Sequence, residues 1–533
     1  MNRPKFYVYL PIIFSLILIL GIFIGTTFHP TGNLGTISVD ANNKYNKIEE
    51  ILRYIQQEYV DTVNNKQLVE KTIVSMLQNL DPHSSYISAD ELQANNEPLK
   101  GNFEGIGIEF NIVEDTICVI AALPGGPAEA VGIQAGDKIV AVEGKKAAGI
   151  KITNKDVLEK LKGKGHTKVK VSIMRRGKPQ LLAFTITRGT IPIFSIDAAY
   201  MVNPKTGYIK ISRFAATTYD EYIKSFEKLK ELGMQQLIID LRGNGGGYLN
   251  TAVDIADEFL SDKKEIVYTQ GKARPKKAYK ATSKGDFEKG KLIILIDDGS
   301  ASASEILAGA IQDNDRGMIV GRRSFGKGLV QEQSEFTDGS AIRLTIARYY
   351  TPTGRCIQKP YTEGVEAYYN EEYKRYTSGE LENADSMKIA DSLKFKTPEG
   401  KIVYGGGGIT PDVFVPLDTA GRSRYLSEVI YSGILNDFAF NYADRERKKL
   451  NAYNTFKNFN NSFLITDEVL NEFTEYAQKN KIVPNAQQIK LSKEIIKIQL
   501  KALIARNIWS NEGYYPVIQS RDNVLKKAIE LMK

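Results

Sequence analysis

The stretch that decides the fold is Leu292-Ile-Ile-Leu-Ile-Asp-Asp-Gly-Ser-Ala-Ser-Ala-Ser-Glu-Ile-Leu-Ala-Gly-Ala-Ile-Gln312. Its first five residues are apolar and predict a buried strand, and the apolar spacing over residues 304–312 predicts a helix after it. The same alternation occurs upstream, where the strand pattern Leu237-Ile-Ile-Asp240 precedes a helical pattern over 251–260. Strands that alternate with helices are typical of an α/β unit, so we expect the chemistry of the chain in this layer.

Three other patterns flank this layer. Apolar residues at helical spacing between 47 and 80 predict a small helical domain, which ends in the turn Asp81-Pro-His-Ser-Ser85. Short strand patterns separated by turns, from 101 to 188, predict a compact half-barrel. Beyond residue 418 the chain is rich in helical patterns, and we interpret one apolar stripe there as a packing face. That stripe consists of Ile496, Leu500, Leu503, Ile504 and Ile508.

The N-terminus carries the pattern of a membrane anchor. Basic residues in Asn2-Arg-Pro-Lys5 precede a mostly apolar run over 7–28, which is long enough as a helix to cross a hydrocarbon core of about 30 Å. The basic end favours a signal anchor with that end in the cytoplasm. A cleaved signal peptide is the alternative, although Gly25-Thr-Thr-Phe28 is a poor cleavage site. In either case residues 29–533 are expected outside the cytoplasm. We expect a single pass through the cytoplasmic membrane, with the catalytic part in the periplasm.

Composition excludes several classes of protein. The 533 residues are 42% hydrophobic and 25% charged with a net charge of +8, so a disordered, collagen-like or multi-span membrane protein is excluded. The positive balance is modest and does not support nucleic acid binding. The two cysteines, Cys118 and Cys356, lie far apart in the sequence without metal-ligand spacing, and we expect neither a metal nor a disulfide.

A candidate nucleophile lies in the quoted stretch. Gly299-Ser-Ala-Ser-Ala-Ser-Glu305 joins the predicted strand to the predicted helix, so its hydroxyl groups lie near the free N–H groups at a helix start, which favour an oxyanion. A second interpretation is also open. Ser302 and Glu305 match the capping box, in which both residues serve only to start the helix.

A serine nucleophile needs a base, and histidine is not available in this layer. The three histidines are His29, His83 and His166, so a Ser-His-Asp triad cannot form within the layer. Lys327 lies between two glycines and apolar neighbours, where burial would lower the pKa of its amine and leave it neutral near pH 7. The alternative is an exposed lysine on a glycine turn.

Other patterns in this region are weaker. Residues 321–327 match the start of a P-loop, but Gly328 stands where a Mg²⁺-binding Ser or Thr is required. Residues 324–327 read SxxK and residues 205–207 read KTG, in the wrong order for a penicillin-binding site. The stretch Asp240-Leu-Arg-Gly-Asn-Gly-Gly-Gly247 could present backbone N–H groups to an oxyanion, or it could be a plain strand-to-helix turn.

Together and in this order, the motifs resemble those of the carboxy-terminal processing peptidases, also called tail-specific proteases. The resemblance covers residues 47–416. Its motifs are Asp81-Pro-His-Ser84, Phe103-Glu-Gly-Ile-Gly-Ile108, Gly125-Gly-Pro-Ala-Glu-Ala-Val-Gly-Ile-Gln-Ala-Gly-Asp137, Asp240-Leu-Arg-Gly-Asn-Gly-Gly-Gly247, Ser300-Ala-Ser-Ala-Ser-Glu305, Phe325-Gly-Lys-Gly-Leu-Val-Gln331, Tyr350-Thr-Pro-Thr-Gly-Arg355 and Gly408-Ile-Thr-Pro-Asp412.

The resemblance implies a Ser-Lys dyad. It makes Ser302 the nucleophile, Lys327, 25 residues later, the base, and Gln331 the residue that supports the lysine. It also implies further positions in the core. These are backbone N–H groups of Ala303 and Gly246 for the oxyanion hole, and Asp313 for structural support.

The half-barrel in turn resembles a PDZ domain, which binds the C-terminal tail of a protein by strand addition and holds its carboxylate in a loop. The resemblance makes Gly105-Ile106-Gly107-Ile108 that loop. It implies a preference for tails that end in small or hydrophobic residues, and a role for the domain in gating the protease.

We therefore expect an α+β multidomain chain of five parts: a signal anchor over 1–30, a helical domain over 42–96, a PDZ domain over 97–188, an α/β serine protease core over 189–417 and a helical region over 418–533. The expected activity is a serine endopeptidase that needs no cofactor or metal and binds no nucleic acid. Its substrates would be proteins or peptides with exposed C-terminal tails. One N-terminal helix would contact the membrane, and the chain could form a homo-oligomer. The competing hypothesis is a non-catalytic PDZ scaffold tethered to the membrane.

Overall fold

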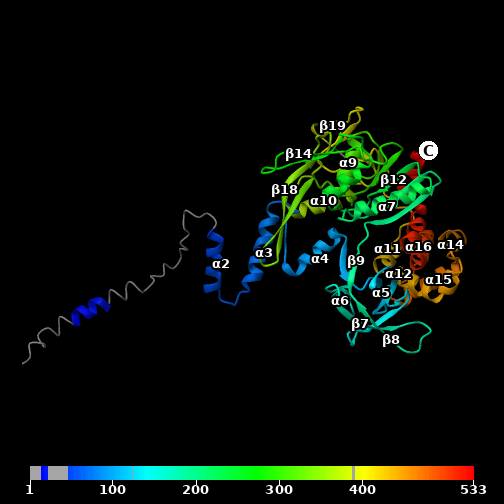
Figure 1. Ribbon diagram of the computed structural model, residues 1–533, viewed down its shortest axis with the longest axis horizontal. Helices are drawn as coiled ribbons and strands as arrows, with labels where there is room; N and C mark the ends of the chain where they lie inside the picture. The colour runs from blue at the N-terminus through cyan, green and yellow to red at the C-terminus, as the bar shows by residue number, and fades with distance from the viewer. Residues whose placement is uncertain (1–13, 22–45, 124, 387–389) are drawn as a thin grey trace, which may run out of the picture. The chain divides into compact units, whose positions relative to one another are not determined.

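The computed structural model describes residues 14–21, 46–123, 125–386 and 390–533, and it divides the chain into two units, 1–74 and 75–533. In the first unit, residues 14–21 are helical and are followed by α2 (Asn46–Glu58) and the start of α3 (Asn65–Gln78) (Figure 1). No helix in the described ranges is both long and apolar enough to span a bilayer. Most of the expected anchor, residues 1–30, lies outside the described residues and stays a prediction.

A helix and a two-stranded ribbon lead from the start of the second unit into the half-barrel. Helix α4 (Ala89–Lys100) has acidic residues in its first turn and ends at Gly101, whose φ of 77° is the left-handed conformation that suits a helix end. Strand β2 (Asn102–Gly105) then pairs antiparallel with β9 (Gly189–Pro192). The two ends of the half-barrel therefore meet in one ribbon.

The half-barrel has a sheet in the order β3-β4-β5-β7-β8 (Figure 1). The two faces of this sheet follow from the alternation of side chains along each strand. In β7, Val169, Val171 and Ile173 are buried, whereas Lys168 and Lys170, which point to the other face, are exposed. Its strands and helices are β3 (Ile108–Val113), β4 (Thr116–Ala122), β5 (Lys138–Val142), β6 (Lys145–Lys146), β7 (Lys168–Met174), β8 (Leu182–Thr187), α5 (Pro127–Ala130) and α6 (Asn154–Leu161). Strand β3 lies at an end of the sheet order.

The predicted α/β layer is present as a six-stranded sheet in the order β10-β11-β12-β15-β16-β21. Only the β10–β11 pair is antiparallel among these strands. The strands are β10 (Ile196–Asn203), β11 (Thr206–Ile211), β12 (Gln236–Asp240), β15 (Leu292–Ile296), β16 (Met318–Gly321) and β21 (Val413–Phe414), and the helices between them include α7 (Thr218–Glu231), α8 (Leu249–Asp257) and α9 (Ala303–Asp313).

Both faces of this sheet are covered, which explains its continuous apolar strands. Leu292, Ile294 and Ile296 of β15 pack in the core cluster formed with α7, α8 and α9. Ile293 and Leu295 pack in the cluster on the other face. All five residues of β15 and all eleven of α9 are buried. The turn between them is therefore held by a rigid strand and a rigid helix.

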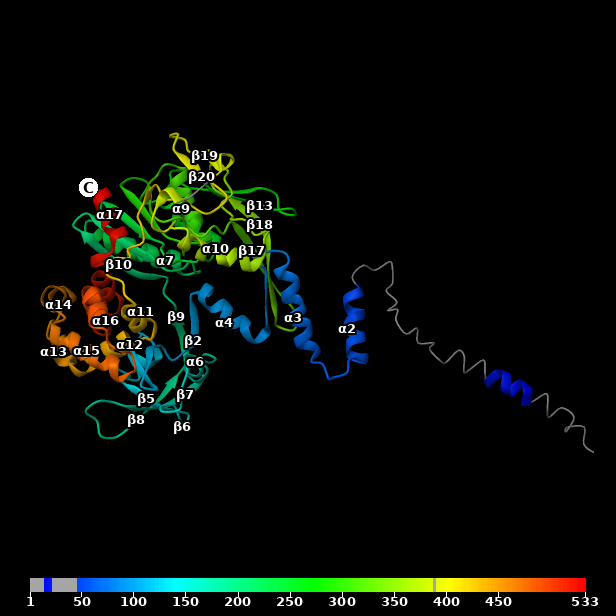
Figure 2. The ribbon, with the colours of Figure 1, turned by 180° about the vertical axis from the view of Figure 1, so that it is seen from behind.

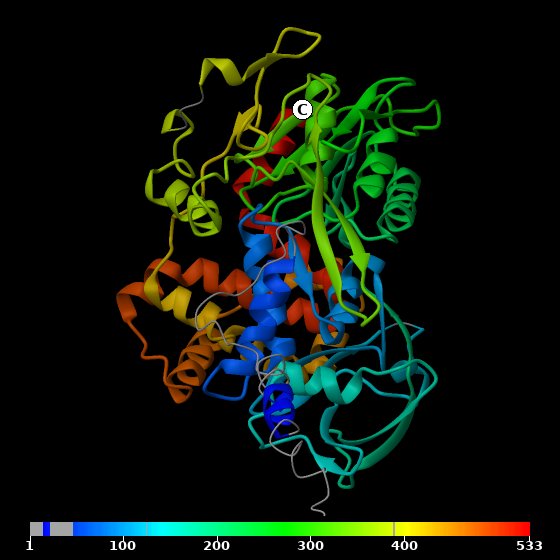
Figure 3. The same cartoon turned by 90° about the vertical axis from the view of Figure 1, so that its left-hand side faces the viewer.

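A second sheet in the core has β18 at its centre. Strand β18 (Ala341–Tyr350) pairs with β17 (Leu329–Glu335), and also with β1 (Ser85–Ile87) and β13 (Glu265–Gln270). Figure 3 shows the long β17–β18 pair in yellow-green. The other elements of this part are β14 (Lys277–Lys280), α10 (Val365–Thr377), β19 (Lys394–Lys396) and β20 (Ile402–Tyr404), with 3-10 turns η1 (Ala384–Ser386) and η2 (Asp391–Leu393).

The region after residue 418 is helical, as expected. It comprises α11 (Arg424–Tyr431), α12 (Ile434–Arg445), α13 (Arg447–Asn451), α14 (Phe456–Ser462), α15 (Asp467–Lys479), α16 (Ala486–Ile518), η3 (Gln519–Arg521) and α17 (Asn523–Met532). The predicted stripe on α16 is a packing face, since Ile496, Leu500 and Ile504 are fully buried. Helix α17 returns to the core, and its Val524 and Leu525 pack on the second face of the six-stranded sheet (Figure 2).

Candidate active site

Ser302 lies at the turn between β15 and α9. Its φ of 56° and ψ of −114° are outside the regions that non-glycine residues ordinarily adopt. Such a conformation costs free energy and persists where the surrounding structure holds it, often at functional sites. Because Ser302 precedes the first residue of the fully buried α9, its hydroxyl lies at the positive end of a helix that cannot move freely.

The Glu305 carboxylate connects the Ser302 turn to the Lys327 loop. This fully buried carboxylate accepts hydrogen bonds from the N–H groups of Ser302, Gly326 and Lys327, each at 2.8 Å, and from the hydroxyl of Ser324. Burial raises the pKa of Glu305, and these four donors act against that rise. The sequence predicted Glu305 only as a helix-capping partner, so its contact with the lysine loop was missed.

Lys327 lies in the loop between β16 and β17. Burial is the main cause that lowers the pKa of its amine from the ordinary value, while the charges of Glu305 and Asp81 act to raise it. Close packing explains the flanking glycines, because a Cβ at Gly328 would lie 2.9 Å from the backbone N of Gln358. The lysine is therefore partly buried in a closely packed loop and does not lie on an exposed turn.

Gln331, on β17, bridges the lysine to a distant turn. Lys327 Nζ donates to Gln331 Oε1 at 3.2 Å, and Gln331 Nε2 donates to the carbonyl oxygen of His83. The Asp81 carboxylate fixes that turn, because it accepts from the N–H groups of His83 and Ser84, at 2.8 Å each, and from the Ser84 hydroxyl. Both ends of the Gln331 amide are thus bonded, which fixes its orientation toward the amine.

The His83 imidazole does not reach the lysine. Its Nε2 lies 2.8 Å from the Tyr368 hydroxyl. Burial, with a further contribution from the positive charge of Lys327, lowers the pKa of His83 to about 4. The histidine is therefore neutral at physiological pH, and it contributes to the site through its backbone carbonyl. A local sequence pattern does not reveal this contact, because His83 and Gln331 are 248 residues apart.

The three predicted catalytic side chains line one cavity of about 570 Å³. Ser302, Lys327 and Gln331 share it with Gly246, Tyr248, Leu329 and Arg343, among others. In the described chain the Lys327 amine bonds to Gln331 and not to the Ser302 hydroxyl. The structure therefore brings nucleophile and base candidates to one cavity, with the amine directed to its supporting amide.

Gly246 lies where the resemblance placed it, directly against the Ser302 turn. A Cβ added to it would be 2.7 Å from Ser302 Cβ and 2.9 Å from the backbone N of Ala303. However, its own N–H donates to Asn244 Oδ1 at 2.8 Å, so this group is already engaged. Ala303 is the first residue of α9, and the first N–H groups of a helix have no intrahelical acceptor. Ala303 thus fits the predicted oxyanion role better than Gly246 does.

Asp313 lies at the other end of α9, away from the cavity lining. It forms a fully buried ion pair with Arg355 at 2.6 Å, and also accepts from the Thr353 hydroxyl at 2.7 Å. These bonds join α9 to the segment after β18. The position fits the structural role that the sequence analysis gave to Asp313.

The predicted peptide-binding loop lies between β2 and β3. The carbonyl of Ile106 accepts from the Ala128 N–H at 2.9 Å, and that of Gly107 accepts from the Leu123 N–H at 3.0 Å. Gly107 has a φ of 76°, and its surroundings leave little room for a side chain. Ile108 begins β3, the end strand of the half-barrel sheet. The loop is thus anchored next to a strand that pairs on one side only within that sheet order.

Comparison with known proteins finds family matches over much of the chain. Residues 205–368 match the model of peptidase family S41, residues 119–175 match a PDZ domain, and residues 31–91 match the "Activating protease CtpB N-terminal domain". Residues 425–510 match a family of unknown function, DUF8443.

Several similar proteins are named as carboxy-terminal processing proteases. The carboxy-terminal-processing protease of Bartonella bacilliformis is 35% identical over 332 residues, which are 60% of this chain and 75% of that protein. The carboxy-terminal processing protease CtpB of Bacillus subtilis is 34% identical over 347 residues, 64% and 71% of the two chains. Among solved structures, a photosystem II D1 C-terminal processing protease is 26% identical, with a TM-score of 0.34, over 68% of this chain and 86% of that one.

The fold and the relatives define a serine peptidase with a PDZ domain. The chain belongs to peptidase family S41, among the carboxy-terminal processing proteases. The family predicted from the sequence motifs is therefore confirmed, as is the expectation of a mixed multidomain fold with a helical C-terminal region.

Proposed function

We propose that this chain is a membrane-tethered endopeptidase that hydrolyses peptide bonds with a Ser302–Lys327 dyad. The observation that carries the proposal is the shared cavity, in which a serine on a strained turn and a partly buried lysine with a lowered pKa both lie. A neutral amine can act as a general base, and a serine at a helix start is placed to stabilise the charge that develops during attack.

In the proposed reaction, Ser302 Oγ attacks the peptide carbonyl carbon while its proton passes to the neutral Lys327 amine. The resulting oxyanion accepts a hydrogen bond from the Ala303 N–H. Lys327 then gives the proton to the leaving amine, and the C–N bond breaks to leave an acyl-enzyme. Water attacks this ester with Lys327 as the base, which returns the serine hydroxyl. Gln331 keeps the amine oriented throughout.

The PDZ domain supplies the substrate tail. An extended chain can add to the free edge of β3, while the Gly105–Ile108 loop holds its carboxylate. The relatives are named carboxy-terminal processing proteases, which supports recognition of the substrate by its C-terminus. Tails that end in small or hydrophobic residues would suit the apolar Ile106 and Ile108.

The location proposed for the enzyme follows from the N-terminal sequence. Residues 1–30 would anchor the chain in the cytoplasmic membrane by a single pass, with the protease on the periplasmic side. Self-association would involve α2, on which Ile48 and Ile51 are exposed.

The test is cleavage of an unfolded protein with an apolar C-terminus by the full-length chain, analysed by mass spectrometry. Ser302→Ala and Lys327→Ala are expected to abolish cleavage, while Lys263→Ala, which removes an exposed lysine, leaves the wild-type rate. Equal cleavage by all variants would remove the dyad from the mechanism. Equal absence of cleavage with retained tail binding would instead favour the non-catalytic scaffold.

A further inference from the structure

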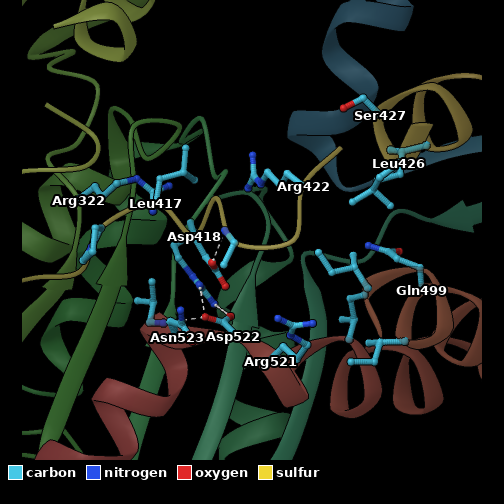
Figure 4. Close-up of a pocket in the computed structure, with 18 of the residues that line it drawn as sticks. Arg322, Leu417, Asp418, Arg422, Leu426, Ser427, Gln499, Arg521, Asp522 and Asn523 are labelled. Carbon is cyan, nitrogen blue, oxygen red and sulfur yellow. Dashed lines mark hydrogen bonds and ion pairs between the residues drawn. The ribbon is translucent and has the colours of Figure 1, made fainter. Parts of the chain in front are cut away.

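A second cavity, of about 530 Å³, lies between the protease core and the C-terminal helices (Figure 4). Loops of the core form one part of its wall, and α11, α16 and the start of α17 form another. Its lining has no residue in common with the cavity of Ser302 and Lys327. Its volume is within the range of about 300–1,000 Å³ that is typical of sites for small ligands.

The charged part of the lining is rich in arginine, with four arginines and two aspartates. Two of the arginines are already neutralised. Arg242 binds both oxygens of Asp522, at 3.0 and 2.7 Å, and also binds Asp240, while Arg322 binds Asp298 at 3.1 Å. These two arginines, which follow strands β12 and β16, therefore take part in structural ion pairs.

The remaining two arginines, Arg422 and Arg521, have no such partner. Among the described residues, neither guanidinium makes an ion pair or a side-chain hydrogen bond, although both line the cavity (Figure 4). The remaining acidic residue of the lining, Asp418, accepts from the Ala420 N–H at 3.0 Å. Two guanidinium groups with unused donors therefore face a cavity with one acidic side chain left to oppose them.

The rest of the wall is largely aliphatic. Its aliphatic residues are Leu417, Leu426, Ile430, Ile495, Ile498, Ile518 and Val524. A guanidinium group binds carboxylates and phosphates through two parallel hydrogen bonds, and aliphatic walls favour a ligand that removes apolar surface from water. In open α/β sheets, ligands also tend to bind beyond the carboxyl ends of the strands, which is where Arg242 and Arg322 lie.

We propose that this cavity binds a small amphiphilic anion, a carboxylate or phosphate monoester carried on an aliphatic chain. Arg422 and Arg521 bind the anionic group, and the aliphatic residues of α11 and α16 contact the chain. The site is separate from the peptidase cavity, so its occupancy does not depend on the proposed dyad.

The proposal is tested by equilibrium dialysis of the full-length chain with octanoate and octyl phosphate, which differ in their anionic group. Two controls each lack one part of the ligand: octanol has the aliphatic chain without the anionic group, and inorganic phosphate has the anionic group without the chain. We expect saturable binding of at least one octyl anion, and binding about tenfold weaker for both controls. Equal binding of octanol would overturn the proposal, because it would leave no role for the arginines.

Variants locate the site. Arg422→Ala with Arg521→Ala is expected to weaken binding of the octyl anion about tenfold. Ser427→Glu should have the same effect, because it introduces a carboxylate into the lining that competes for the guanidinium groups. The matched control is Arg424→Ala, since that exposed arginine pairs with Glu428 and lies outside the lining. The full-length chain is kept in detergent, and the amount of ligand that partitions into the detergent is the same for each variant, so it does not affect the comparison.

Thermal unfolding of each variant checks that the fold is retained. Unchanged binding in both the double variant and Ser427→Glu would exclude this cavity as the site. Binding does not require peptidase activity, so Ser302→Ala should bind the anion as the wild type does. This result separates a failure of the anion site from a failure of the proposed catalytic function.

Discussion

At the scale of single residues, the geometry of the site depends on one buried carboxylate. Glu305 binds backbone N–H groups on both the Ser302 turn and the Lys327 loop, so one side chain sets the relative position of the two proposed catalytic residues. Tyr349 strengthens the link, because its one hydroxyl proton is shared between the carbonyl oxygens of Ser302 and Lys327. A serine and a lysine 25 residues apart in sequence are thereby held at one cavity.

The state of the Lys327 amine should govern the pH dependence. The proposed base acts when neutral, so kcat/KM is expected to rise with pH through the lowered pKa of Lys327 and level off below its ordinary value. Lys327→Arg retains the positive charge but cannot become a base near neutral pH, so cleavage should fall to background. Substantial activity of this variant in a fluorogenic peptide assay would contradict the dyad.

Gln331→Glu tests the same amine without removing it. A carboxylate in place of the amide oxygen, 3.2 Å from Nζ, favours the charged amine and raises its pKa. The rising limb of the pH profile should move to higher pH, and the rate on that limb should fall about tenfold for every pH unit by which the limb moves. A lower rate with an unmoved limb would assign Gln331 a purely structural role.

Alanine substitutions at two neighbouring glycines, Gly246 and Gly245, give a test variant and its matched control. Gly246→Ala places a methyl group 2.7 Å from Ser302 Cβ, so we expect a loss of kcat of at least about a hundredfold. Gly245 has no atom within 4 Å of an added Cβ, so Gly245→Ala should keep most of the activity. Steady-state kinetics of the two variants decide this, and similar losses in both would indicate general damage to the loop.

At the scale of elements, the C-terminal helices are tied to the glycine loop of the core. Asp522, the N-cap of α17, binds Arg242, which follows β12 and precedes Gly246 by four residues. Nearby, Gln519 donates to the hydroxyl of Tyr208 on β11. The helical region after 418 is therefore a structural support of the protease and not an independent attachment.

Asp522→Asn is expected to weaken this support. Asparagine can still cap α17 but loses the charge that pairs with Arg242, so the free energy of unfolding should fall by about 1–3 kcal/mol. We also expect a lower kcat with little change in KM, because the glycine loop loses a constraint while the PDZ domain is untouched. Thermal unfolding and kinetics measure the two effects.

The control for that experiment is Asp467→Asn. Asp467 is a largely exposed residue in the first turn of α15, paired with Lys493 and Lys497, and its substitution should change stability little. An Asp522→Asn variant that matched this control in both measurements would show that the Arg242 pair does not support the loop.

The sequence revealed those elements whose formation depends on local pattern. The apolar runs of β12 and β15 predict buried strands because both faces of that sheet are covered, and the helix of α9 follows from its own apolar spacing. Pairs distant in sequence, such as Gln331 with His83 and Arg242 with Asp522, have no local pattern. The bond from the Gly246 N–H to Asn244 was also missed, because a glycine turn in sequence does not show where its N–H groups point.

At the scale of the whole molecule, the proposed tail recognition and the proposed chemistry belong to different domains. The proposed carboxylate loop, Gly105–Ile108, belongs to the PDZ domain, while Ser302 and Lys327 belong to the core, and the β2–β9 ribbon connects the two. Tail capture should therefore affect how much substrate binds, whereas the dyad sets how fast bound substrate reacts.

A substrate with an amidated C-terminus separates these two steps. Amidation removes the negative charge that the Gly105–Ile108 loop would bind, but leaves the scissile bond and its surroundings unchanged. We expect KM to rise about tenfold and kcat to stay within about twofold when the same internally quenched peptide is compared with a free or an amidated end. A fall in kcat at unchanged KM would mean that tail binding activates the core rather than concentrating the substrate. Equal kinetics for both peptides would contradict tail capture and leave a protease that selects internal sequence alone.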